Sequence, residues 1–373
     1  MSIIKNLFDQ SMRILYLTPS HIDYLSDQLY FGLCRQLGWE SIIDYPYKEI
    51  YHEPPKKVPS LPQNPGQRFQ ESDIMSDLND HKFDLVILSA IRREPLEALD
   101  TFKRRCILPP LILVDGDDGV EINTELFEKH QFSLYFKREY LATNNQRLEH
   151  FYNRWKAYGM RKNISDRTFP LPFSIILESI PQHKDQKPDI DISFIGIASH
   201  RNRIRAVNIL HEAKDLNFEG KVFAESITRK SKLVMGTFEI LKAKLQGDPY
   251  PTKDEQAGIL SRPDYFQLLR RSQMGLSIRG AGFDTVRYWE IVAAKRVLVS
   301  EEPYIHIPHN FENGKHALFC KPDLSDLATI VRRHARDQSF CETMVKAAYN
   351  HLLQYHTCAE RAKQFLTICE ERL

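Results

Sequence analysis

The strongest limit on the fold of this chain is a rhythm of short apolar runs separated by helical patterns. Between the first two runs, leucine recurs at every fourth position along Tyr24–Leu37, as on one face of a helix. Short continuous apolar strands interleaved with helices are typical of a parallel sheet that helices cover on both faces. The strands expected in the first half are Arg13–Leu17, Ser41–Asp44, Asp84–Ser89, Pro110–Val114 and Ser133–Lys137.

The rhythm breaks at a proline-containing stretch and then starts again. Residues Phe169–Phe173 and Ser179–Pro188 form this stretch, which we interpret as a linker that ends just before Asp189. Two doubly wound α/β domains joined by such a linker enclose a cleft, and ligands of such sheets bind at the carboxyl ends of the strands. The strands expected in the second half are Asp191–Ile197, Lys221–Ala224, Met274–Ile278 and Arg296–Ser300.

The composition excludes several classes of protein. The 373 residues suffice for two domains of ordinary size. The net charge of +2, from 51 basic and 49 acidic residues, argues against a broad nucleic-acid-binding or membrane-binding surface. No apolar run is long enough for a transmembrane helix, and the N-terminus lacks the apolar core of a signal peptide. The six cysteines form no CxxC pair, so we expect reduced thiols and a cytoplasmic protein.

Common cofactor and metal motifs are also absent from the sequence. No G-x-G-x-x-G follows the first strand, no G-x-x-x-x-G-K-[ST] occurs, and no G-x-S-x-G nucleophile elbow occurs. The acidic turn Asp115–Asp118 could hold a metal or a polyol, but its glycine and closing residue do not fit a calcium loop. An ordinary loop explains this turn better. We therefore expect no metal and no cofactor.

A loop and helix over residues 280–300 form the first candidate site. A helix capped by Asp284 or Thr285 would present free N–H groups that, with the preceding glycine loop, can seat an anion such as a diphosphate. Arg287 and Glu290 share a helix face, which suits a phosphate and a ribose diol. Alternatively, they simply pair with each other in a buried βαβ unit. The candidates are Arg279, Gly280, Gly282, Asp284, Thr285, Arg287 and Glu290.

A second candidate site is the strand-to-helix turn Gly196–Arg203, with the sequence GIASHRNR. Gly196 permits close approach of a backbone or ligand. Arg201 and Arg203 bring positive charge to a helix start, which is unfavourable for the helix dipole unless an anion binds there. A solvated helix turn is the alternative interpretation.

A third candidate site lies after the first strand, where His21, Asp23 and Asp27 follow one another closely. His21 or Asp23 could act as a general base toward an acceptor hydroxyl. The alternative is structural: Ser20 or Asp23 caps the following helix and His21 lies on the surface.

The C-terminal half resembles a known enzyme family. Residues 265–303 contain the pattern G-x-D-x-x-R-x-W-E before a strand, here Gly282, Asp284, Arg287, Trp289 and Glu290. This pattern, followed by residues 308–331, resembles GT-B glycosyltransferases of the family-1-like group, and within it the spore-maturation-type branch. The resemblance is strong over about 191–366 and diffuse before it.

The resemblance implies two Rossmann-like domains that face each other across a cleft. It divides the chain into an acceptor domain (1–178), a linker (179–188), a nucleotide-sugar donor domain (189–356) and a helix (357–373) that crosses back to the first domain. Glu290 would bind the donor ribose, and the 280–285 loop with Arg287 would contact the donor phosphates. Arg201 or Arg203 would assist, and no metal would be required.

One position departs from the family pattern. Many relatives carry a Glu-x7-Glu motif, whereas the position eight before Glu290 is Gly282. Retention and inversion of the sugar both stay open. We expect a cytoplasmic glycosyltransferase that uses a nucleotide-diphosphate sugar and an acceptor glycan, small molecule or protein. A non-catalytic nucleotide-sugar-binding subunit is the alternative, and an unrelated two-domain ligand-binding protein is a more distant one.

Overall fold

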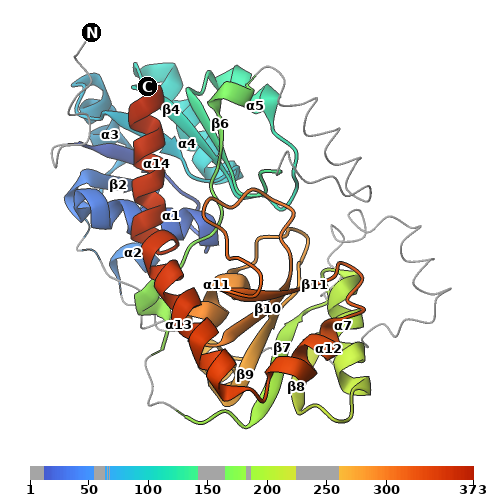
Figure 1. Ribbon diagram of the computed structural model, residues 1–373. Coiled ribbons are helices and arrows are strands. Elements are labelled where there is room, and N and C mark those ends of the chain that lie inside the picture. The colour runs from blue at the N-terminus through green and yellow to red at the C-terminus, as the bar shows by residue number, and fades with distance from the viewer. Residues whose placement is uncertain are drawn as a thin grey trace.

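A computed structural model describes residues 12–53, 64, 66, 68–141, 164–181, 186–223 and 260–373. These residues form two parallel β-sheets, one from each half of the chain, with helices packed around them (Figure 1). The expected fold of two Rossmann-like α/β halves is therefore confirmed. The domain boundaries at 178 and 188 stay a prediction, and residues 182–185 of the expected linker lie outside the described residues.

The first sheet has six strands in the order β2-β1-β3-β4-β5-β6, and neighbouring strands are parallel. The expected runs form its first five strands, which are buried almost throughout. The sequence predicts an interruption at Phe169–Phe173, whereas the start of this segment pairs with β5 as a sixth strand. The strands are β1 (Ile14–Leu17), β2 (Ile42–Tyr45), β3 (Leu85–Leu88), β4 (Leu111–Asp115), β5 (Leu134–Lys137) and β6 (Thr168–Pro170).

The second sheet has five strands in the order β11-β10-β9-β7-β8, again all parallel. All four expected runs contribute strands, and Ala317–Cys320 adds an edge strand that the sequence analysis did not identify. The strands are β7 (Ile190–Ile197), β8 (Phe218–Phe223), β9 (Ser272–Ser277), β10 (Val297–Glu301) and β11 (Ala317–Cys320).

Most helices begin at a residue whose side chain caps the first turn. Asp23 accepts a hydrogen bond from Ser26 N–H at 3.2 Å and so starts the first helix where the leucine repeat predicts it. The α-helices are α1 (Tyr24–Leu37), α2 (Glu49–His52), α3 (Glu71–Asn79), α4 (Arg93–Arg105), α5 (Thr124–His130), α7 (Arg201–Glu212), α10 (Arg262–Arg271), α11 (Val286–Ala293), α12 (Leu327–His334), α13 (Gln338–Tyr355) and α14 (Cys358–Arg372). Short 3-10 turns lie at Trp39–Ser41, Ser165–Arg167 and Leu177–Ser179.

The last helix returns to the first half of the molecule. Figure 1 shows α13 beside the second sheet and α14 running along α1 at the first sheet. The two helices are in close contact at Gly32, where an added Cβ would lie 2.8 Å from the Cβ of Ala362. Phe365 of α14 packs on Phe136 of β5 with ring centroids 4.4 Å apart. The two halves therefore share one hydrophobic core.

Each sheet has one point where the chain reverses its direction of strand addition. This point lies between β1 and β3 in the first sheet and between β7 and β9 in the second. Ligands of open α/β sheets bind beyond the carboxyl ends of the strands at such a point. The loops that follow these four strands are therefore the places to look for a site.

Candidate functional site

Two helices begin side by side at the reversal point of the second sheet. β7 leads through residues 198–200 into α7, and β9 leads through residues 278–285 into α11. Because the two strands are hydrogen-bonded neighbours, the N-termini of both helices lie at one edge. The first N–H groups of a helix have no partner within it and carry partial positive charge, so this edge favours an anion.

Arg203 connects the two loops of this edge. Its guanidinium donates to the carbonyl oxygens of Ile197 at 3.0 Å, Ile278 at 3.2 Å and Arg279 at 3.0 Å. A Cβ at Gly280 would lie 2.9 Å from Nη2 of Arg203, so the loop depends on glycine here. The structure thus brings together residues from the first and second candidate sites.

The positive potential of this edge affects the pKa of His200. It caps α7, with Nδ1 accepting from Asn202 N–H at 3.2 Å. Burial and the charges of Arg279, Arg201 and Arg203 lower the pKa of His200 to about 3. The ring is therefore neutral at physiological pH, and because Nδ1 accepts a hydrogen bond, the ring proton is on Nε2. Sequence reasoning missed His200, although its place directly before a helix made it a candidate cap.

A buried carboxylate faces the same arginines. Glu301, at the end of β10, accepts from the backbone N–H of Arg279 at 2.7 Å and from Asn202 Nδ2 at 3.2 Å. Burial raises its pKa, while the N–H and charge of Arg279 oppose that effect. Nothing in the sequence indicates this role, because Glu301 is the last residue of an apolar strand and reaches this edge only through the sheet order.

Arg287 lies beneath the end of β7. Its guanidinium donates to the carbonyl of Ile195 and stands 4.8 Å from the ring centroid of Phe194. A Cβ at Gly196 would lie 3.2 Å from Nη2 of Arg287, so these two predicted site residues are neighbours.

Glu290 has an ion-pair partner that the sequence analysis did not identify. Arg262, at the start of α10, places Nη1 2.7 Å from Oε1 of Glu290. The same guanidinium donates to the hydroxyl of Ser179 at 3.1 Å. Glu290 is 6% exposed, and burial together with the charge of Glu290 raises the pKa of the adjacent Tyr265 hydroxyl. The carboxylate is therefore fixed in a largely dry environment.

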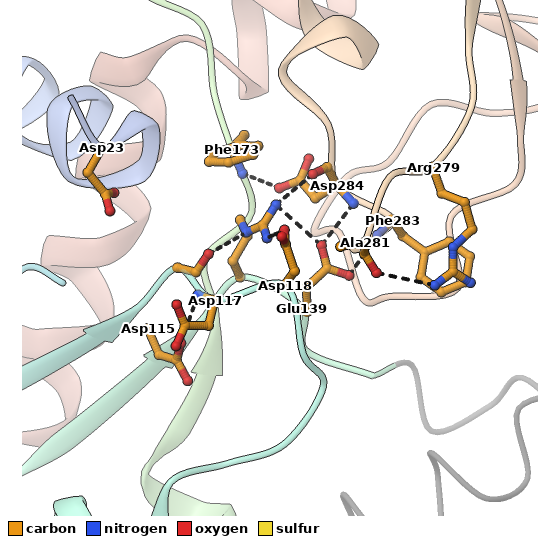
Figure 2. Close-up of polar contacts among 12 residues, drawn as sticks. Asp23, Asp115, Asp117, Asp118, Glu139, Phe173, Arg279, Ala281, Phe283 and Asp284 are labelled. Carbon is orange, nitrogen blue, oxygen red and sulfur yellow. Dashed lines mark hydrogen bonds and ion pairs between the residues drawn. The ribbon is translucent and has the colours of Figure 1, made fainter. Parts of the chain in front are cut away.

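Asp284 and Thr285 are used in different ways. Thr285 occupies the N-cap position of α11, and its hydroxyl lies 3.0 Å from that of Ser277. The buried carboxylate of Asp284 accepts from Trp289 Nε1 at 2.9 Å and from the backbone N–H of Phe173 in the first half of the chain. Figure 2 shows the Asp284 side chain directed toward Phe173.

The two halves of the chain meet at this point through buried charges. Arg138, which follows β5, donates to the carbonyl oxygen of Asp284 at 2.6 Å and also bonds Asp118. Glu139 accepts from the backbone N–H groups of Phe283 and Asp284, both at 2.9 Å. Burial raises the pKa of Glu139 to about 7, although the charge of Arg138 and these two N–H groups oppose the rise. In Figure 2, Asp117 and Asp118 lie on one side of this contact, and Arg279 lies on the other.

The loop after β1 carries the proposed bases. His21 is exposed, and Asp23 caps α1 with one carboxylate oxygen 3.8 Å from Arg92 Nη2. Asp27 is buried against Lys48 and Tyr51, and burial raises its pKa. Asp23 is thus a helix cap, while its assignment as a base stays a prediction.

The acidic turn after β4 is internally compensated. The carboxylate of Asp115 accepts from Lys137 Nζ at 2.8 Å and from the hydroxyl of Tyr135. Across the described part of the chain, no group of three or more His, Cys, Asp or Glu side chains could hold a metal ion. None of the helices among the described residues has the length and hydropathy needed to cross a bilayer.

The comparisons with known proteins agree with this geometry. Residues 221–367 match the family described as "Glycosyl transferase-like". The two parallel sheets of the chain form a GT-B fold, and residues 221–367 carry the likeness to this family. No curated protein matches the chain in sequence.

Solved GT-B structures align with nearly the whole of this chain. A glycosyltransferase from Rickettsia africae is 12% identical with a TM-score of 0.59, over 97% of this chain and 98% of that one. HepE from Anabaena, solved with UDP and glucose, is 11% identical with a TM-score of 0.55, over 96% and 99%. The DNA-modifying enzyme β-glucosyltransferase, solved with and without uridine diphosphoglucose, is 14% identical with a TM-score of 0.53, over 97% and 99%. At these identities the likeness concerns the fold.

Proposed function

We propose that this glycosyltransferase moves a sugar from a nucleotide-diphosphate donor, of the UDP-glucose kind, to an acceptor held by the first sheet. The observation that carries the proposal is the edge where α7 and α11 begin. Two helix N-termini lie there beside the buried carboxylate of Glu290, together with the side chains of Arg203, Arg279 and Arg287. Such an edge is suited to a diphosphate with its attached ribose.

The donor would be bound by charge and by hydrogen bonds. The helix N–H groups and guanidinium groups would stabilise the negative charge that develops on the leaving diphosphate, and this supports a metal-independent reaction. Glu290 would accept hydrogen bonds from the ribose hydroxyls. HepE was solved with UDP, and β-glucosyltransferase was solved with uridine diphosphoglucose. These ligands favour uridine as the first base to test.

The acceptor would bind at the carboxyl ends of the first sheet. A cavity of about 500 Å³ lies there, lined among others by Asp117, Glu121, Thr124 and Lys137. Its carboxylates suit the hydroxyl groups of a polyol or sugar. If the reaction inverts, His21 or Asp23 would accept the proton of the attacking hydroxyl. We also propose a cytoplasmic location and the spore-maturation-type branch, on the composition and motif given above.

Nucleotide binding tests the donor assignment. Uridine, guanosine, thymidine and cytidine diphosphates would be compared by thermal shift, because a ligand that binds only the native state raises its apparent stability. We expect uridine diphosphate to give the largest rise in melting temperature. We also expect the protein to release free UDP slowly from UDP-glucose in water. If none of the four raises the melting temperature, the proposal is wrong.

The absence of a side chain at Gly282 supports one alternative function. Where many relatives carry the first carboxylate of Glu-x7-Glu, this chain has none at that position. A non-catalytic binding subunit would bind UDP but release no glucose from UDP-glucose, so the hydrolysis assay separates the two functions.

A further inference from the structure

The segment that follows β5 lies between two loops of the second half. Tyr140 accepts at its carbonyl oxygen from His306 N–H at 2.7 Å, and Leu141 forms an antiparallel bridge with Ile305. Leu141 also packs with Tyr304 in a small buried cluster. These contacts fix the segment against the second half on one side, and Glu139 extends from it toward the loop before α11.

Glu139 holds that loop by its backbone. Oε2 accepts from Phe283 N–H and Oε1 from Asp284 N–H, so each carboxylate oxygen takes one of two consecutive amides. The side chain is fully buried, and the guanidinium of Arg138 lies 3.5 Å from Oε1. Burying a carboxylate costs free energy unless it is paired and hydrogen-bonded, and here both conditions are met.

The loop leaves room for this carboxylate and no more. A Cβ at Gly282 would lie 2.7 Å from Cδ of Glu139, inside van der Waals contact. Any side chain at position 282 would therefore push the carboxylate away from the two amides. The fit joins position 282 in one half to position 139 in the other.

We propose that Glu139 is a positioning residue for the donor site, and this inference rests on the proposed function. By holding the amides of Phe283 and Asp284, Glu139 sets the path of the loop that leads into α11. That path determines where the free N–H groups of Val286 and Arg287 point. The acceptor half thus completes the donor half, and full donor affinity requires the two halves to be apposed.

Two variants test the inference by different routes. Glu139→Ala removes the carboxylate, and Gly282→Ala displaces it without changing its charge. We expect each to raise the Kd for UDP and the KM for UDP-glucose at least tenfold, with a smaller change in kcat. Asp77→Asn is the matched control, because Asp77 pairs with Arg13 and Lys82 in the first half. It should leave both constants unchanged.

The measurements distinguish positioning from general stability. Kd is measured by calorimetry well below the melting temperature of each variant, where a loss of stability alone leaves binding intact. Since both single changes break one interaction, the double variant should bind UDP about as weakly as Glu139→Ala. Wild-type Kd in the folded Glu139→Ala or Gly282→Ala protein would overturn the inference and leave the proposed function standing. A wild-type protein that binds no nucleoside diphosphate would overturn both.

Discussion

The guanidinium of Arg262 and the carboxylate of Glu290 form an ion pair, with Nη1 2.7 Å from Oε1. Arg262 also bonds Ser179, in the stretch between the two sheets, so the pair connects α10, α11 and that stretch. Oε1 is therefore held by Arg262, and we propose that Oε2 accepts hydrogen bonds from the ribose hydroxyls.

Glu290→Ala is expected to weaken UDP binding at least tenfold and to leave the fold intact. Arg262 is 30% exposed at its side chain, so water can solvate its charge once the partner is gone. Calorimetry gives the affinity and circular dichroism the fold. Glu290→Gln keeps an acceptor oxygen, so its affinity for UDP should lie between those of wild type and Glu290→Ala. Unchanged UDP binding in Glu290→Ala would contradict the assignment.

Arg203→Lys is expected to lower both stability and donor affinity. A lysine cannot reach the three carbonyl oxygens that the guanidinium contacts, and buried hydrogen bonds from a charged donor contribute about 2 kcal/mol to stability. Urea unfolding and UDP calorimetry measure the two effects. Arg205→Ala, an exposed position on the same helix, is the control and should change neither. An Arg203→Lys protein with wild-type stability would show that these three hydrogen bonds do not contribute to stability.

The stability of the protein should depend on pH through Glu139. Its pKa is raised from 4.5 to about 7 by burial, so the folded state holds this proton more tightly than the unfolded state does. The contribution of Glu139 to the free energy of unfolding should therefore fall as pH rises from about 4.5 to about 7. At about 1.4 kcal/mol per pKa unit, the fall attributable to Glu139 is at most about 3.5 kcal/mol.

Glu139→Gln isolates that contribution. Asp284 and Asp27 also have raised pKa values and give a slope of the same sign, whereas His200, with its lowered pKa, gives the opposite slope. The comparison is therefore between wild type and variant. Arg138 is present in both proteins. In urea unfolding at several pH values, the free energy of unfolding should decline less with rising pH for the variant than for wild type. Parallel curves for the two proteins would mean that Glu139 titrates as it does in the unfolded chain.

Gly32→Val is expected to destabilise the protein by at least about 2 kcal/mol. The new side chain would overlap Ala362 and the backbone of Cys358, so α1 and α14 would have to separate. Gly116→Ala is the control, because its Cβ would meet Leu25 at an ordinary 3.4 Å, and its stability should stay within about 0.5 kcal/mol of wild type. Thermal and urea unfolding report both. Equal stability of Gly32→Val and wild type would show that the helices are not in firm contact.

The architecture could be predicted because its signals are local. Continuous apolar runs gave β1 to β5, and the leucine repeat gave α1 with its cap at Asp23. Strand boundaries were predicted less well: β9 begins at Ser272, before the expected Met274, because Ser272 pairs with Ile190 of β7. β6 was missed because its prolines suggest a linker, although an edge strand tolerates proline.

The site could be predicted only where its residues are close in sequence. The loop before α11 carries its own glycines and helix start, and these are visible in the sequence. Glu139 meets Asp284 across 145 positions, and nothing near Glu139 in the sequence indicates that meeting. Arg262 and Glu301 were missed for the same reason. Contacts between distant segments depend on strand order, and that order is a property of the whole fold.

The crossing of α14 also constrains how the protein is made. The surface of Phe136 and α1 is covered by a helix that the ribosome produces only after the strands of both sheets. At typical rates of synthesis, about 10 to 40 seconds pass between the end of β6 and the start of α14. During that interval the nascent first half exposes an apolar face, and chaperones have time to bind it.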